Sequence, residues 1–168
     1  VGSEMCIRDR YDYGNGAFGD WGPHILDTAH RFLKLGLPNK ITAVHREGVR
    51  NLIFPMGSTI QFDFPERENE PACEVRWYDG TRNKPKPPKE LEEGRRLENN
   101  GKVIYGKDLT FKGTSHGSPL RIIPEDKMKD MASSLPKFGG GSNHYLNFVL
   151  GAKGCLLYTS DAADDVEC

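Results

Sequence analysis

The spacing of apolar residues predicts a helix near the start of the chain. Between residues 22 and 38 they recur at steps of three and four, the repeat of one helix face, at Ile25, Leu26, Ala29, Phe32 and Leu33. Pro23 suits the first turn of this helix, where its missing N–H is not needed. Gly36 and Pro38 are expected to end the helix.

The middle of the chain predicts strands. Residues 40–49 alternate around Ile41, Ala43 and His45, and further strands are expected within residues 72–80 and 101–123. Residues 58–64 also alternate, which predicts one buried and one exposed face. The expected buried side chains are Ile60, Phe62 and Phe64, and the expected exposed ones are Thr59, Gln61 and Asp63.

Helices return toward the end of the chain. A short helix is expected after Pro124, and a second amphipathic helix within residues 139–154 has Ser142 or Asn143 as its cap. The order of helix, strands and helices predicts an α+β fold with a mostly antiparallel open sheet and helices on one face.

The two ends of the chain resemble a translated sequencing adapter. The DNA that encodes "MCIRD" (5–9) is the reverse complement of the DNA that encodes "CLLYT" (155–159). A protein has no physical reason to begin and end on inverted DNA repeats, so residues 1–10 and 155–168 are expected to be non-native. Residues 11–154 are then expected to form one domain, as a fragment of a longer protein.

Composition excludes few classes of protein. The chain has 23 Lys+Arg and 24 Asp+Glu, and residues 11–154 hold 21 and 18 of them, a net charge near +3. That charge is too mild to imply binding to nucleic acid or to an anionic membrane. No apolar run is long enough to predict a membrane span. Cys73 is the one cysteine within 11–154, so no disulfide is expected there.

The first predicted helix carries the candidate chemistry. Asp20, His24 and Asp27 follow one another at steps of four and three, which places them on one stripe if the helix extends back to Asp20. A carboxylate can fix the tautomer of an imidazole, which can then take a proton from a substrate hydroxyl. A first-turn position would favour neutral His24. The alternative is that Asp20 caps the helix and His24 is a half-buried helix residue.

The remaining motifs are weaker. "GNGAFG" (14–19) fits the spacing of a dinucleotide fingerprint, but it does not follow a hydrophobic strand and is discounted. "FGGGSN" (138–143) is interpreted as a flexible connection rather than a phosphate cradle. The other histidines show no metal-ligand spacing and are expected to be structural or solvated; they are His30, His45, His116 and His144. No metal site is predicted.

The glycine-rich segment and the helix after it also carry a family resemblance. "GNGAFGDWGPHILD" (14–27) resembles the G-x-G-x-x-x-D-x-G-x-H-x-x-D signature of the Gfo/Idh/MocA oxidoreductases, the glucose–fructose oxidoreductase and inositol dehydrogenase group. "LKLGLPNKITAV" (33–44) is similar to the same family. "WYDG" (77–80), "IIPEDKMKD" (122–130) and "NHYLNFVLGAKG" (143–154) resemble one bacterial, often exported, branch. The resemblance covers most of residues 14–153.

The resemblance implies a two-domain enzyme of which this chain is the C-terminal domain. A Rossmann domain that binds NAD or NADP would lie outside the chain, so the fragment alone is expected to be inactive and to bind no nucleotide. The resemblance implies a small-molecule sugar or cyclitol substrate and a homo-oligomer formed through the sheet. It is compatible with a cytoplasmic or a periplasmic location.

The resemblance also assigns roles to residues. His24 is the implied acid/base catalyst, and Asp20 orients it or binds a neighbouring hydroxyl. Asn15, where many members have glycine, is a further candidate for substrate binding. The implied supporting residues are Asp27, Gly16 and Gly22. Two alternatives stay open: a related NAD-dependent enzyme that cleaves glycosides, and a non-catalytic binding or assembly domain.

Overall fold

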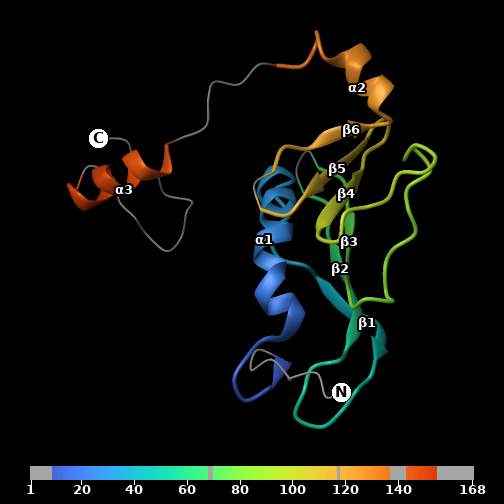
Figure 1. The fold of residues 1–168 in the computed structure, drawn as a ribbon, viewed down its shortest axis with the longest axis vertical. Coiled ribbons are helices and arrows are strands. Elements are labelled where there is room, and N and C mark those ends of the chain that lie inside the picture. The colour runs from blue at the N-terminus through green and yellow to red at the C-terminus, as the bar shows by residue number, and fades with distance from the viewer. Residues whose placement is uncertain (1–8, 68–69, 117, 137–142, 155–168) are drawn as a thin grey trace. The chain divides into compact units, whose positions relative to one another are not determined.

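A computed structural model describes residues 9–67, 70–116, 118–136 and 143–154 (Figure 1). The chain divides into two units, Val1–Ser133 and Ser134–Cys168. Within the described residues, the first unit contains helix α1 (Gly16–Phe32), strands β1 to β6 and helix α2 (Glu125–Met131), and the second contains helix α3 (His144–Ala152). Every strand pair is antiparallel, which confirms the predicted α+β class.

The first sheet has the strand order β1-β2-β3, with β1 at Lys40–Glu47, β2 at Gly57–Phe64 and β3 at Cys73–Asp79. The alternation predicted for β1 is wrong, because a bulge interrupts the register between Ala43 and His45. Ala43 pairs with Ile60 and His45 with Thr59, so the two β1 residues lie on opposite faces of the sheet.

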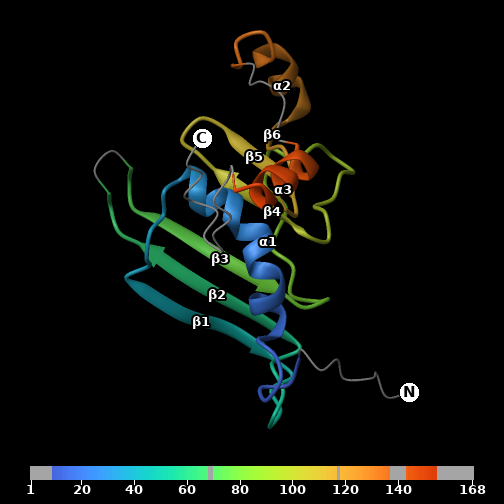
Figure 2. The same ribbon diagram turned by 90° about the vertical axis from the view of Figure 1, so that its left-hand side faces the viewer.

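Helix α1 crosses one face of this sheet, as Figure 2 shows. Phe18 stacks on Phe62 with 5.4 Å between ring centroids, and it meets Trp77 edge to face at 5.3 Å. Trp77 is 6% exposed and lies opposite Ile60 in the register. Burial of these aromatic side chains removes a large apolar area from water and holds α1 on the sheet.

The opposite face of β2 is not the exposed surface that alternation predicts. Thr59 is 4% exposed, because the loop after β3 covers it. Asn83 in that loop donates from Nδ2 to the carbonyl oxygen of Ser58 at 2.8 Å and to Thr59 Oγ1 at 2.9 Å. Asp79 accepts hydrogen bonds from Ser58 N and from Trp77 Nε1 at 2.8 and 2.7 Å. A polar network therefore fixes the loop after β3 to the start of β2.

The second sheet has the order β4-β5-β6, with β4 at Gly101–Tyr105, β5 at Thr110–Thr114 and β6 at Arg121–Ile123. The described strands thus form two three-stranded sheets rather than one large open sheet. Helix α1 contacts both β3 and β4, and α2 follows β6 directly in the chain. Ile122 and Ile123 of β6 are buried in the core.

Helix α1 begins earlier than the sequence predicts. Gly16 is its first residue, so the placement of Pro23 in the first turn is wrong and Pro23 lies inside the helix. Gly16 has φ +67° and is buried, and an added Cβ would lie 2.7 Å from Cγ of Phe54. The helix ends at Phe32, ahead of Gly36, because Lys34 already adopts the left-handed conformation with φ 46°.

Residues at the two ends of the described chain also form defined contacts. The amide of Phe54 donates to the carbonyl oxygen of Asp9 at 2.8 Å, and Arg10 forms an isolated bridge with Ile53. These are backbone contacts, which any residue type at positions 9 and 10 could make. In the second unit, Asn143 caps α3 by accepting a hydrogen bond from Leu146 N at 3.0 Å, while Ser142 lies outside the described residues.

No helix in the described ranges is both long enough and apolar enough to cross a lipid bilayer.

Candidate functional site

Helix α1 presents Asp20, His24 and Asp27 in succession. Because α1 starts at Gly16, Asp20 lies within the helix, and the alternative in which Asp20 is the N-cap is wrong. Asn15 precedes the helix and makes no side-chain capping hydrogen bond. His24 lies beyond the first turn, where the partial positive charge of the helix terminus has decayed. The expectation that His24 lies in the first turn, on which that effect rested, is therefore wrong.

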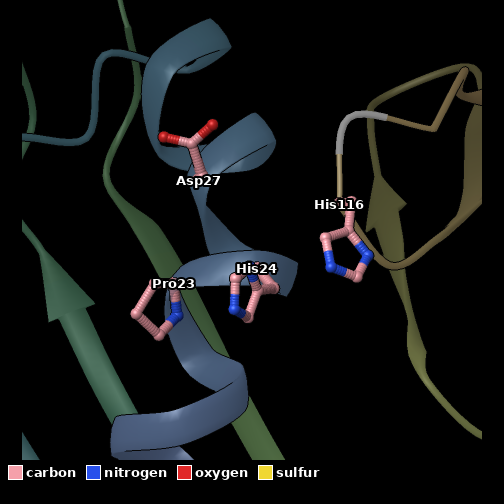
Figure 3. Close-up of a pocket in the computed structure, with 4 residues that line it drawn as sticks. All are labelled: Pro23, His24, Asp27 and His116. Atoms are coloured by element: carbon pink, nitrogen blue, oxygen red, sulfur yellow. The ribbon is translucent and has the colours of Figure 1, made fainter. Parts of the chain in front are cut away.

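An open hollow of about 320 Å³ lies beside the middle of α1. Pro23, His24 and Asp27 line it from the helix, and His116 lines it from the turn after β5 (Figure 3). Both His24 and His116 are exposed. Asp20 and Asn15 are not among the lining residues, although Asp20 is one helical turn from His24. The hollow therefore brings together two imidazoles and one carboxylate from separate parts of the chain.

The two imidazoles lie close to each other. Their ring centroids are 4.7 Å apart and the ring planes are tilted by 38°. The indole of Trp21 lies 6.2 Å from each ring, edge to face, and completes an aromatic cluster on this side of α1. Such contacts restrict how far either imidazole can turn.

The backbone of His116 is fixed to one turn of α1. Its amide donates to the carbonyl oxygen of His24 at 2.6 Å, and its carbonyl oxygen accepts from Thr28 Oγ1 at 3.3 Å. His116 has φ 57°, a left-handed conformation that is uncommon for residues other than glycine. The turn after β5 is therefore held against α1 by contacts that do not involve the imidazole of His116.

Lys102 of β4 reinforces this attachment. Its Nζ donates to the carbonyl oxygen of His116 at 2.9 Å, to the carbonyl oxygen of Ile25 at 3.2 Å and to Thr28 Oγ1 at 3.2 Å. Burial lowers the pKa of the Lys102 ammonium from its usual 10.5, and the negative charge of Asp27 opposes this shift. One ammonium group thus joins β4, α1 and the turn of His116.

The glycines named as supporting residues lie on the packed side of α1. Gly16 is buried against Phe54, and Gly22 is buried beside the ring of Phe18, 3.2 Å from where a Cβ would lie. Asn15 is exposed immediately before the helix. Gly16 therefore allows the start of α1 to approach Phe54 closely, and Gly22 leaves room for the ring of Phe18 on the same helix.

Within the described residues, the other candidates from the sequence do not gather into a second site. A second hollow of about 350 Å³ runs along α1 itself, and His30, on its edge, contacts the carbonyl oxygen of Gly36 through Nε2 at 2.9 Å. Residues 138–142 of the glycine-rich segment lie outside the described residues. Among the residues that the structure describes, no cluster of three or more His, Cys, Asp or Glu side chains could hold a metal ion.

His116 and Lys102 are the site residues that the sequence did not identify. Thr28 and His116 lie 88 residues apart, and no short-range spacing connects the two segments. Neither residue belongs to the motifs that carried the family resemblance. Their place beside His24 follows from the packing of β4 and the β5–β6 turn on α1.

Comparison with known proteins adds no family assignment. No family model, no curated protein and no solved structure matches the chain.

Proposed function

We propose that this chain is the substrate-binding C-terminal part of an NAD(P)-dependent oxidoreductase that acts on a hydroxyl of a sugar or cyclitol. The observation that carries the proposal is the exposed imidazole of His24 at an open hollow, one helical turn after Asp20. The order of Asp20, Gly22, His24 and Asp27 also follows the signature that the sequence resembles.

In this proposal His24 is the general base. One imidazole nitrogen accepts the proton of the substrate hydroxyl as the carbon that carries it is oxidised. In the substrate complex Asp20, one helical turn before His24, would orient the imidazole or bind a neighbouring hydroxyl, and its carboxylate would favour the imidazolium that forms. Asp27 lines the hollow and adds a second negative charge near the cation of Lys102.

The described residues contain no parallel βαβ unit, the arrangement in which a Rossmann domain holds the pyrophosphate of a dinucleotide. A pyrophosphate turn needs a strand that leads through glycines into a helix within a parallel βαβ unit, and every described strand pair is antiparallel. Gly16 of the glycine run is buried against Phe54. NAD or NADP, the proposed hydride acceptor, would therefore be held by another part of the parent enzyme.

Substitution of His24 in the complete parent enzyme tests the proposal. His24→Ala should lower kcat by ~100- to 10,000-fold with a much smaller change in KM, because a general base acts mainly in the transition state. Asp20→Asn should also slow turnover. His45→Ala, on the exposed strand β1, is the matched control and should keep its turnover. A folded His24→Ala enzyme with near-normal kcat would instead favour a non-catalytic binding or assembly domain.

A further inference from the structure

His116 is held in the hollow but has no role in the chemistry assigned to His24 and Asp20. Three hydrogen bonds fix its backbone to α1 and to Lys102, and none of them uses the ring. Nδ1 of the ring contacts Ser115 Oγ at 3.0 Å. Within the described part of the chain, Nε2 of His116 and both ring nitrogens of His24 have no hydrogen-bonding partner. The hollow therefore contains two neighbouring imidazoles that can each bind a polar group.

We propose that His116 is a second substrate-binding residue, which hydrogen-bonds the hydroxyl adjacent to the one that reacts at His24. This inference rests on the proposed function, because sugars and cyclitols carry hydroxyls on neighbouring carbons. The imidazole centroids lie 4.7 Å apart, too close for a substrate to enter between the rings. The substrate therefore lies across their nitrogen-bearing edges, where each imidazole can donate or accept one hydrogen bond.

Lys102 is the positioning residue for His116. Its ammonium binds the carbonyl oxygen of His116 and two oxygens of α1, so it fixes the distance between the two imidazoles without lining the hollow. Loss of this donor leaves the carbonyl oxygens of His116 and Ile25 with fewer partners and loosens the turn after β5. Binding that depends on His116 should weaken as a result, whereas contacts made by His24 alone should persist.

The competing explanation is that His116 only packs on His24 and Trp21. Ring packing requires an aromatic ring but not a ring nitrogen. His116→Phe separates the two explanations, because phenylalanine keeps the ring and removes both nitrogens. Packing alone predicts that His116→Phe binds diols as the unaltered chain does.

The experiment titrates the full chain, labelled at histidine for NMR, with a vicinal cyclohexanediol and with cyclohexanol. The two probes differ by the neighbouring hydroxyl alone. We expect the diol to shift the resonances of both His24 and His116 and to bind ~2- to 10-fold more tightly than cyclohexanol, the range that one net hydrogen bond gives. His116→Phe should abolish this preference and leave the affinity for cyclohexanol unchanged. His45 on β1 serves as the unperturbed reference resonance.

Lys102 variants complete the test. Lys102→Met should reduce the preference for the diol, and Lys102→Arg should restore part of it, with melting temperature recorded to confirm folding. Equal affinity for both probes, a diol preference that survives His116→Phe, or no shift at either imidazole up to the solubility limit would overturn the inference. Failure of the proposed function is a separate result, namely normal kcat in the His24→Ala enzyme.

Discussion

At the scale of single residues, glycine occupies left-handed positions for two different reasons. Gly16 and Gly36 have nearly the same φ, +67° and +66°. A Cβ at Gly16 would lie 2.7 Å from Phe54, whereas no atom lies within 4 Å of a Cβ at Gly36. Substituting Gly36 therefore tests backbone strain alone, whereas substituting Gly16 tests backbone strain together with steric crowding by Phe54.

We expect Gly36→Ala to lower the free energy of unfolding by about 1–2 kcal/mol, the cost of a left-handed conformation for an L-residue. Gly16→Ala should cost a further ~1–3 kcal/mol, because its Cβ must displace the ring of Phe54. Denaturant unfolding of both variants measures the difference. Equal decreases in the free energy of unfolding would show that the ring of Phe54 moves away from the added Cβ without an energetic cost.

The candidate site was predictable in part at this scale. The spacing of Asp20, His24 and Asp27 is a local property of a helix, so it can be read from the sequence once the helix is recognised. His116 reaches His24 through hydrogen bonds between α1, β4 and the β5–β6 turn, which depend on tertiary packing. Local patterning carries no information about such contacts.

At the scale of elements, the start of α2 is held by a distant side chain. Glu92 accepts a hydrogen bond from the amide of Glu125 at 2.7 Å through Oε1, and Arg95 pairs with the carboxylate of Glu125 at 3.0 Å. The hydrogen bond from the Glu125 amide lowers the pKa of Glu92 below its usual 4.5. Pro124 is the N-cap residue of α2, but its side chain makes no capping hydrogen bond. The loop before β4 supplies that hydrogen bond instead.

This geometry predicts a pH dependence of stability. A carboxyl whose pKa is lowered on folding binds fewer protons in the folded state, so its stabilisation is fully present above its unfolded pKa of 4.5. The stabilisation is lost as pH falls through the folded pKa. We expect Glu92→Gln to flatten the acid limb of the stability curve, measured by denaturant unfolding between neutral pH and about pH 3. Glu93→Gln, next along the chain, should leave that limb as it is.

The elements themselves were largely predictable, but their ends and faces were not. Asn143 caps α3 as its residue type suggests, because capping is a local interaction. The predicted start of α1 was wrong, because the helix begins at Gly16, which packs against Phe54, well before Pro23. The predicted exposure of Thr59 was wrong, because Asn83, in a loop beyond the next strand, covers this side chain. Each failure traces to a contact between segments that are far apart in sequence.

At the scale of the whole molecule, the α+β class followed from the order of helical and strand-like runs. The division of the strands into two sheets could not be predicted in this way, because the alternation within a strand does not indicate which other strands pair with it. The same antiparallel pairing gives a prediction about nucleotides. The parallel unit that binds pyrophosphate is absent from the described part of the chain.

We therefore expect the chain alone to bind neither NAD nor NADP with micromolar affinity. Calorimetric titration with each nucleotide provides the measurement, and the complete parent enzyme is the positive control. A micromolar Kd for the isolated chain would require a nucleotide site that the antiparallel sheets do not offer.

The bulge in β1 has a consequence for how copies of the molecule can meet. β1 forms one edge of its sheet, and an unbroken edge strand offers a continuous row of N–H and C=O groups to a strand of another molecule. Val44 falls at the break in register, so that row is interrupted midway along the strand. The kink discourages open-ended, fibre-like stacking of sheets edge to edge, and we expect copies that assemble through this sheet to meet across its face.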